Sequence, residues 1–170
     1  MVAGIPRTNV STNKDEWCTP IELYDKLNEE FRFDLDAACD NENCLCAYAL
    51  TKEMDSLKHA WAEYTMDNGE PARSIFLNPP YGRGVIAEFV KKAFWESLSG
   101  ATVVCLLPFS GASWFTDYCL HAAEIRILGR VKFIGFAADG SLIKNSPTFD
   151  SCVVVFKPGH HEVKLSKFRW

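Results

Sequence analysis

Apolar residues along this chain fall into two patterns, continuous runs and positions three or four residues apart. Residues 101–107 and 151–156 are apolar almost throughout, which is typical of strands buried on both faces of a sheet. Residues 85–98 instead space their apolar side chains at helical intervals, which predicts a helix with one buried face. The chain is therefore expected to combine buried strands with amphipathic helices.

The same patterns place further elements between polar loops. The predicted strands are residues 33–37, 74–77, 101–107, 124–128, 131–136 and 151–156. The predicted helices are residues 19–31, 85–98 and 114–122, and residues 48–50 fit either a brief helix or a brief strand. Thr19 would be the N-cap of the first helix, with Pro20 as its first residue and Glu22 completing a capping box.

This order of elements predicts an α/β fold with a doubly wound, mostly parallel sheet and helices on both faces. The predicted strands 124–128 and 131–136 are close enough in sequence to form a hairpin, and a long loop would follow over residues 137–149. We divide the chain into a flexible N-terminal lead (1–14), one domain (15–158) and a C-terminal tail or edge strand (159–170).

Composition narrows the class of protein. A chain of 170 residues with 48% apolar and 24% charged residues is typical of one soluble globular domain. It has no 18-residue apolar run and no apolar N-terminal signal, so we expect no membrane segment. The net charge of −4 argues mildly against strong nonspecific binding to nucleic acid, although it leaves room for a local basic face.

Seven cysteines raise the question of a metal site or disulfides. Cys39, Cys44 and Cys46 are close together, but their spacing is not a usual zinc pattern and the chain has no C-x-x-C pair. An odd count without a signal peptide favours reduced thiols, as in a cytosol. We therefore expect no metal and no disulfide.

The tetrapeptide Asn78-Pro79-Pro80-Tyr81 carries the clearest chemical signal. It follows a predicted strand, and ligands of open α/β sheets bind at the carboxyl ends of strands. The two prolines stiffen the turn and hold Asn78 extended, so the Asn78 side-chain oxygen and the Pro79 carbonyl converge as acceptors. Two acceptors suit an amine with two N–H groups, and they would stabilise positive charge on its nitrogen during methylation. Tyr81 offers an aromatic face for a planar base; the alternative is a proline turn with Tyr81 as a packing residue.

Several segments together resemble one known family. They are Asp15-Glu16-Trp17-Cys18-Thr19-Pro20, Phe33-Asp34-Leu35-Asp36-Ala37-Ala38, Leu77-Asn78-Pro79-Pro80-Tyr81-Gly82, Ala101-Thr102-Val103-Val104 and Ser151-Cys152-Val153-Val154-Val155-Phe156. In this order they resemble the small phage-encoded N6-adenine DNA methyltransferases that use S-adenosylmethionine. The resemblance implies a Rossmann-like methyltransferase sheet whose last strand is antiparallel, and it makes residues 15–158 the methyltransferase domain.

The resemblance also implies roles for single residues. Asn78 and Pro79 would hold the target amine in the turn that Pro80 stiffens, and Tyr81 would stack on the base. The segment containing Trp17, Thr19 and Pro20 would contact the methionine part of the cofactor, unless Thr19 and Pro20 only start a helix.

Other residues of the cofactor site are expected from the first strand and the loop after it. Asp36, beside Ala37, would accept a hydrogen bond from the cofactor α-amino group, or alternatively cap the next turn. The glycine-rich G-x-G turn of many methyltransferases is missing here. Asp55 is the best candidate for binding the ribose, with Glu53 as the runner-up, unless both are solvated acids.

Duplex DNA would have to present a flipped adenine, because N6 is out of reach in the stack. Phe109, Phe133 and Phe136 are candidates for an aromatic opposite Tyr81, with a place in the core as the alternative for each. Arg83, Lys132 and Lys144 are the candidates for DNA phosphate contacts, with solvated surface charges as the alternative. Sequence recognition would come from loops 81–84, 110–113 and 137–149.

The leading hypothesis is an adenine-specific DNA methyltransferase that modifies phage or prophage DNA against restriction, in the cytosol of a bacterial host. One alternative keeps the fold and cofactor but methylates RNA or a protein glutamine, since enzymes of that last kind share the tetrapeptide. Another is a catalytically inactive nucleic-acid-binding module. The recognition sequence and the oligomeric state stay open.

Overall fold

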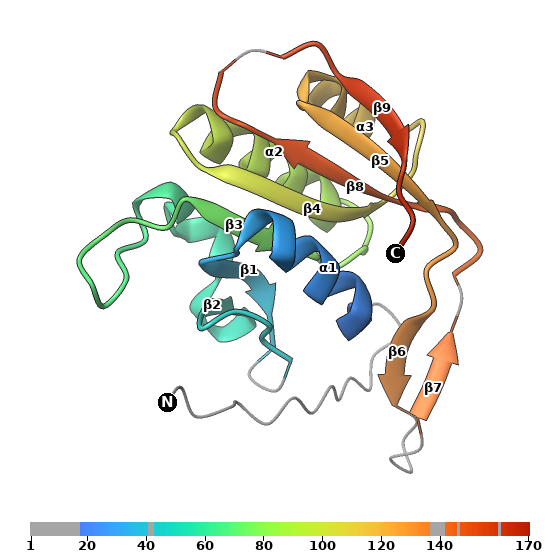
Figure 1. The fold of residues 1–170 in the computed structure, drawn as a ribbon, viewed down its shortest axis with the longest axis horizontal. Helices are drawn as coiled ribbons and strands as arrows, with labels where there is room; N and C mark the ends of the chain where they lie inside the picture. The colour runs from blue at the N-terminus through green and yellow to red at the C-terminus, as the bar shows by residue number, and fades with distance from the viewer. Residues whose placement is uncertain (1–17, 41–42, 137–141, 146, 160) are drawn as a thin grey trace.

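A seven-stranded sheet forms the centre of the molecule (Figure 1). The computed structural model describes residues 18–40, 43–136, 142–145, 147–159 and 161–170. The strands of the sheet are β1 (Leu35–Cys39), β2 (Tyr48–Thr51), β3 (Ser74–Leu77), β4 (Thr102–Pro108), β5 (Glu124–Gly129), β8 (Ser151–Phe156) and β9 (Lys164–Lys167). Their spatial order is β2-β1-β3-β4-β8-β5-β9, and β8 is antiparallel to both of its neighbours while every other pair is parallel. This confirms the predicted Rossmann-like sheet, with its antiparallel strand inserted between β4 and β5.

Helices cover both faces of the sheet, as predicted. They are α1 (Ile21–Phe31), α2 (Val85–Leu98) and α3 (Ser113–Tyr118), with short 3-10 turns at η1 (Lys52–Met54), η2 (Ser56–Lys58), η3 (Trp61–Glu63) and η4 (Cys119–His121). Alternate residues of β4 divide between two cores: Val103 and Cys105 pack with α2 and α3, whereas Val104 and Leu106 pack with α1. A strand buried on both faces must be apolar throughout, which explains its continuous run.

The predicted hairpin between residues 124–128 and 131–136 is wrong. β6 (Phe133–Phe136) pairs instead with β7 (Leu142–Asn145) in a separate two-stranded sheet, and β7 falls within the segment expected to be a loop. β5 cannot accept β6, because β8 and β9 occupy its two edges. The β6–β7 ribbon therefore extends from the main sheet where β5 ends and β8 begins (Figure 1).

The predicted capping box at the first helix is also wrong. Pro20 is the N-cap of α1, no side chain caps the helix, and Pro20 O accepts from the backbone N–H groups of Leu23 and Tyr24. The strand after it begins at Leu35 rather than at residue 33, because Arg32 closes α1 in a left-handed conformation (φ 51°). The predicted helix 114–122 is split between α3 and η4.

Cys39 and Cys44 form a disulfide, so the expectation of reduced thiols throughout is wrong for this pair. The short loop after β1 brings the two Cα atoms to 5.1 Å. The other described cysteines (Cys18, Cys46, Cys105, Cys119 and Cys152) are not part of this disulfide and are buried. Within the described ranges, no cluster of three or more His, Cys, Asp or Glu side chains could hold a metal ion, and no helix is long and apolar enough to cross a membrane.

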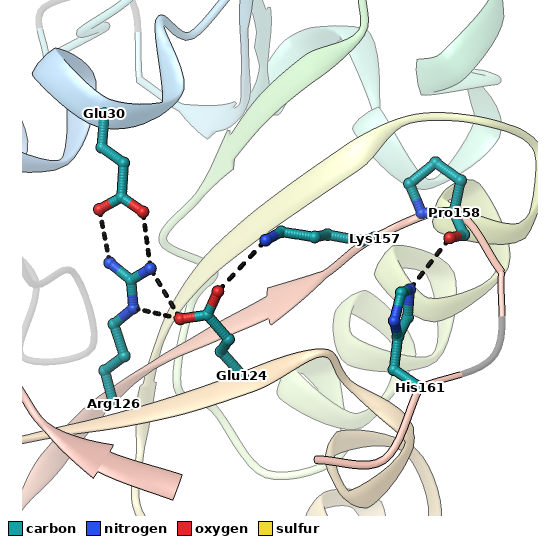
Figure 2. Close-up of polar contacts among 6 residues, drawn as sticks. All are labelled: Glu30, Glu124, Arg126, Lys157, Pro158 and His161. Atoms are coloured by element: carbon teal, nitrogen blue, oxygen red, sulfur yellow. Dashed lines mark hydrogen bonds and ion pairs between the residues drawn. The ribbon is translucent and has the colours of Figure 1, made fainter. Parts of the chain in front are cut away.

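A buried arginine on β5 joins elements that are far apart in the sequence (Figure 2). Arg126 donates to both carboxylate oxygens of Glu30 on α1, at 2.6 and 2.7 Å, and it also pairs with Glu124 at 2.7 Å. Its guanidinium lies over the rings of Phe31 and Phe168, with its carbon 5.3 and 5.6 Å from the ring centres. The cluster connects α1 and the segment after β9 to β5, near one edge of the sheet.

Candidate active site

The strand order reverses at β1, which identifies the ligand-binding edge of the sheet. The chain passes from β1 to β2 on one side, and then returns to β3 on the other side of β1. In open α/β sheets, ligands bind outside the carboxyl ends of the strands at such a point. Asp36 on β1 is the register partner of Phe76 on β3, and Asn78 follows Phe76 by two residues. Asp36 and Asn78 therefore come from the two strands that flank the crevice.

The Asn78 side chain is held at both ends by hydroxyl groups. Its Nδ2 donates to Thr19 Oγ1 at 3.0 Å, and its Oδ1 accepts from the Tyr81 hydroxyl at 3.0 Å. The same Tyr81 hydroxyl lies 3.1 Å from the carbonyl oxygen of Leu106 on β4. Thr19 is buried, with 4% of its surface exposed. The structure thus brings together three predicted site residues from two segments about sixty positions apart.

The backbone after Asn78 forms a turn that leads directly into α2. Pro79 is buried and Pro80 is exposed. Gly84 precedes the helix at φ 83°, a left-handed conformation that glycine adopts without a steric penalty. Gly82 O accepts from the N–H of Val85 and so closes the first turn. The strand–turn–helix arrangement predicted for the tetrapeptide is confirmed.

Tyr81 is partly buried. Its ring meets Phe133 and Phe149 edge-on, with centroid distances of 6.1 and 5.8 Å, and it packs against both cores. Burial raises the pKa of Tyr81 well above its ordinary value, so the hydroxyl stays protonated and donates. Stacking of Tyr81 on a base stays a prediction, whereas its hydrogen bond to Asn78 could not be read from the sequence.

Asp36 is a buried carboxylate on β1, with 2% of its surface exposed. Its Oδ1 accepts from Ala38 N at 3.2 Å and its Oδ2 from Leu45 N at 3.1 Å. Burial raises the pKa of Asp36 to about 6, although the two backbone hydrogen bonds act in the opposite direction. The carboxylate therefore holds the turn after β1, as the capping alternative predicted, and a cofactor contact stays a prediction.

The loop after β2 contains the candidate ribose ligand and one residue that the sequence did not reveal. Asp55 lies four positions beyond the end of β2, half-exposed, and pairs with Lys58 at 2.7 Å. The neighbouring Ser56 is buried; its hydroxyl donates to the carbonyl of Ala37 on β1, and Trp61 Nε1 donates to Ser56 O at 2.9 Å. These bonds attach the loop to β1. A serine within a polar loop carries no sequence signal for such a role.

Two of the three candidate DNA-contacting side chains, those of Arg83 and Lys132, belong to the described part of the structure. Arg83 and Lys132 are exposed, just after the tetrapeptide and just before β6 respectively. The side chain of Lys144, all of Trp17 and the side chain of Phe136 lie outside the described part of the structure.

Two of the other aromatic candidates, Phe133 and Phe109, differ in how exposed they are to solvent. Phe133 is fully buried and belongs to the core. Phe109, which follows β4, is 45% exposed, so its assignment to the core is wrong. Its backbone N–H donates to Asp150 O at 2.8 Å, which places it beside the start of β8. Phe109 is therefore an accessible aromatic at the carboxyl edge of β4.

The family model for DNA N-6-adenine-methyltransferase (Dam) matches residues 7–167, nearly the whole chain. The chain belongs to the Dam family. This confirms the resemblance inferred from the sequence motifs.

One curated Dam relative is the DNA N-6-adenine-methyltransferase of Escherichia phage T1, 35% identical over 114 residues. That match covers 66% of this chain but 44% of the phage T1 protein, so the chain spans less than half of its relative. A solved structure from Listeria monocytogenes, described as a class I S-adenosylmethionine-dependent methyltransferase, is 13% identical with a TM-score of 0.49. It covers 86% of this chain and 62% of the Listeria chain.

Proposed function

We propose that this protein transfers a methyl group from S-adenosylmethionine to N6 of adenine in DNA. The observation that carries the proposal is the position of Asn78-Pro79-Pro80-Tyr81 at the carboxyl end of β3, beside the point where the strand order reverses, in a chain of the Dam family. Family membership favours DNA over RNA or a protein glutamine as the methyl acceptor. The retained tetrapeptide favours an active enzyme over an inactive binding module.

Asn78 and Pro79 would make the weakly nucleophilic N6 amine of adenine more reactive. The N6 lone pair is delocalised into the adenine ring, which makes the amine a poor nucleophile. Hydrogen bonds from its two N–H groups to Asn78 Oδ1 and the Pro79 carbonyl favour a pyramidal nitrogen and stabilise its developing positive charge. The lone pair then bonds to the methyl carbon as the carbon–sulfur bond breaks, and the amine loses its proton afterwards. No strong general base is needed.

The buried carboxylate of Asp36, on the strand that pairs with β3, supports a site for S-adenosylmethionine beside Asn78. S-adenosylmethionine would supply a methyl group activated by its positively charged sulfur. Asp36, with Ala37 beside it, would accept from the α-ammonium group, since a buried carboxylate is stabilised by a cation. The Trp17–Pro20 segment would lie against the methionine part, and Asp55 would accept from the ribose hydroxyls after exchanging its partner Lys58.

Duplex DNA would bind across the carboxyl edge with its target adenine flipped out. Exposed Phe109 would provide an aromatic surface at the carboxyl end of β4, the strand that pairs with β3, and aromatic stacking contributes roughly 1–3 kcal/mol per base. Arg83 and Lys132 would contact phosphates on either side of the flipped nucleotide, together with Lys144 on the β6–β7 ribbon. Methylation of phage DNA inside a bacterial host would protect it from a restriction nuclease.

The test is methyl transfer from labelled S-adenosylmethionine to unmethylated duplex DNA, with nucleoside mass spectrometry of the product. Appearance of N6-methyladenine supports the proposal. Label in RNA or in a protein glutamine, with none in DNA, would replace the proposed acceptor.

The matched variants are Asn78→Ala and Asn68→Ala. Asn68 lies in an exposed loop between η3 and β3, where its side chain accepts from Glu70 N. We expect Asn78→Ala to lower kcat about 10²–10³-fold, the effect of removing one preorganised polar group, while Asn68→Ala keeps wild-type turnover. Near-normal turnover by Asn78→Ala would refute the role of the amide oxygen.

A further inference from the structure

We infer that the hydroxyl groups of Thr19 and Tyr81 position the Asn78 amide for catalysis, so that Thr19 is a positioning residue of the amine site. This inference rests on the proposed function and deepens it. The family resemblance places Thr19 against the cofactor, and the tetrapeptide alone places Tyr81 against the base. The hydrogen bonds in the structure give both hydroxyls a different task.

Thr19 has the features of a residue that holds another side chain. It does not cap α1, because Pro20 is the N-cap and no side chain caps that helix. Its hydroxyl is buried and accepts from Asn78 Nδ2 at 3.0 Å. Pro20 fixes the backbone next to Thr19 and is itself buried. The Thr19 hydroxyl is thus held at a defined place beside Asn78.

The orientation of the Asn78 amide decides whether the site can bind an amine. The last torsion of an asparagine side chain is broad and roughly two-fold, so an unrestrained amide exchanges the places of its oxygen and nitrogen. The exchanged amide would direct N–H groups at the N–H groups of the substrate, which repel each other. In the structure Nδ2 donates to Thr19 Oγ1, which leaves Oδ1 as the acceptor for the substrate. Because a hydroxyl can donate as well as accept, Thr19 holds the amide group in place and does not by itself choose between its two orientations.

Tyr81 binds the oxygen end of the Asn78 amide, and its hydroxyl keeps a hydrogen-bond acceptor when it releases that oxygen. A phenol carries one proton, and two acceptors lie within reach of it, Asn78 Oδ1 at 3.0 Å and Leu106 O at 3.1 Å. Before the substrate binds, the proton is shared between them. When a substrate N–H takes its place at Oδ1, the hydroxyl donates fully to Leu106 O. No buried donor is then left without an acceptor, which would otherwise cost about 1–3 kcal/mol.

The surrounding structure keeps both hydroxyls in place. Phe133 and Phe149 meet the Tyr81 ring edge-on, and Leu106 belongs to the buried strand β4. Three parts of the fold therefore converge on Asn78: the segment before α1, the strand β4 and the turn after β3. Positions held by packed elements are more precise than positions on exposed loops.

Thr19→Val and Thr19→Ser separate positioning from cofactor binding. Valine keeps the shape of threonine and removes the acceptor, whereas serine keeps the hydroxyl. We expect Thr19→Val to lower kcat about 100-fold, the scale of a small misplacement, with the Kd for S-adenosylmethionine within about 3-fold of wild type. Thr19→Ser should restore most of kcat. A higher Kd for the cofactor with unchanged kcat at saturation would overturn the inference and return Thr19 to the cofactor site.

Tyr81→Phe tests the second hydroxyl, since it keeps the ring. We expect kcat to fall about 10-fold with little change in the KM for DNA, because the lost bond orients the amide and adds no DNA contact. Tyr118→Phe on α3, where the ring packs against Phe94, is the matched control and should behave as wild type. Wild-type kcat in Tyr81→Phe would overturn the role of this hydroxyl.

A readout that needs no activity separates this inference from the proposed function. Nuclear magnetic resonance of the free protein reports the side-chain NH₂ group of Asn78, assigned from the signal lost in Asn78→Ala. We expect slow solvent exchange of this group in wild type and Thr19→Ser, and fast exchange in Thr19→Val. Equal exchange in all three would overturn the inference. Slow exchange without methylation of adenine would instead refute only the proposed function.

Discussion

At the scale of single residues, Asp36 has an unusual environment for a carboxylate. It is buried on β1, and its two oxygens accept from Ala38 N and Leu45 N. Removal from water raises its pKa to about 6, which outweighs the two stabilising hydrogen bonds. The group therefore changes charge close to neutral pH, where an exposed aspartate is fully ionised.

Cofactor affinity should consequently depend on pH through Asp36. In the proposed complex the α-ammonium group binds the ionised Asp36 carboxylate, so the Kd for S-adenosylmethionine should be constant well above pH 6 and rise about tenfold per unit below it. Calorimetric titration between pH 5 and pH 7 measures this. Asp36→Asn should bind weakly with a flat profile. A flat profile in the wild type would show that Asp36 makes no charge contact with the cofactor.

Folding stability should respond to Asp36 in the opposite direction. Because its folded-state pKa is raised, the protonated form is favoured by folding. Below its unfolded-state pKa of about 4, Asp36 does not change the free energy of unfolding. As the pH rises toward 6, Asp36 lowers that free energy increasingly. Loss of cofactor affinity at pH 5 therefore cannot come from unfolding caused by this residue.

At the scale of elements, the sequence predicts which segments are buried, but it does not predict which strands pair with each other. The runs in β4 and β8 are apolar because each strand faces two cores, so the sequence alone reveals them. The pairing of β6 with β7 depends on β8 and β9 occupying both edges of β5, which is a property of the assembled sheet. Local spacing therefore favoured the wrong hairpin.

The candidate site shows the same division. The tetrapeptide could be predicted because its prolines restrict the backbone locally. The hydrogen bond between Asn78 and Thr19 spans 59 positions, and the Leu106 carbonyl leaves no mark in the sequence because every residue carries one. In the sequence, Thr19 also fits the pattern of a helix cap. Only the folded chain shows that it does not cap α1 and that it binds Asn78.

The Arg126 cluster (Figure 2) should stabilise the contact between α1 and the far side of the sheet. Arg126→Met keeps the apolar stem and leaves Glu30 and Glu124 without their guanidinium. Breaking a buried ion pair costs about 3–5 kcal/mol. The side chain of Glu30 is 47% exposed and can be rehydrated, so we expect a smaller loss, about 1–3 kcal/mol of the free energy of unfolding.

Urea unfolding of Arg126→Met beside Arg130→Met measures this loss. Arg130 is exposed in the short segment between β5 and β6, and its replacement should change the free energy of unfolding by less than about 0.5 kcal/mol. Equal stability of the two variants would show that the cluster is a solvated set of charges with no net contribution.

At the scale of the whole molecule, a net charge of −4 has to be reconciled with the polyanionic substrate that we propose. A net charge of −4 disfavours strong nonspecific attraction to DNA, so in the proposed complex the phosphate contacts would be concentrated on a local basic edge. The exposed cations Arg83 and Lys132 flank the tetrapeptide and the β6–β7 ribbon. A local basic edge would orient DNA without making the whole surface basic.

The salt dependence of DNA binding tests this edge directly. Each phosphate contact contributes about −0.9 to the slope of log K against log salt concentration. Arg83→Ala and Lys132→Ala should each make that slope shallower by about 0.9, measured by fluorescence anisotropy on one duplex. Lys91→Ala, in the middle of α2 and exposed, changes the net charge by the same amount and should leave the slope unchanged. If all three variants lowered affinity equally with one common slope, the effect would be that of total charge, and DNA would approach the enzyme by another face.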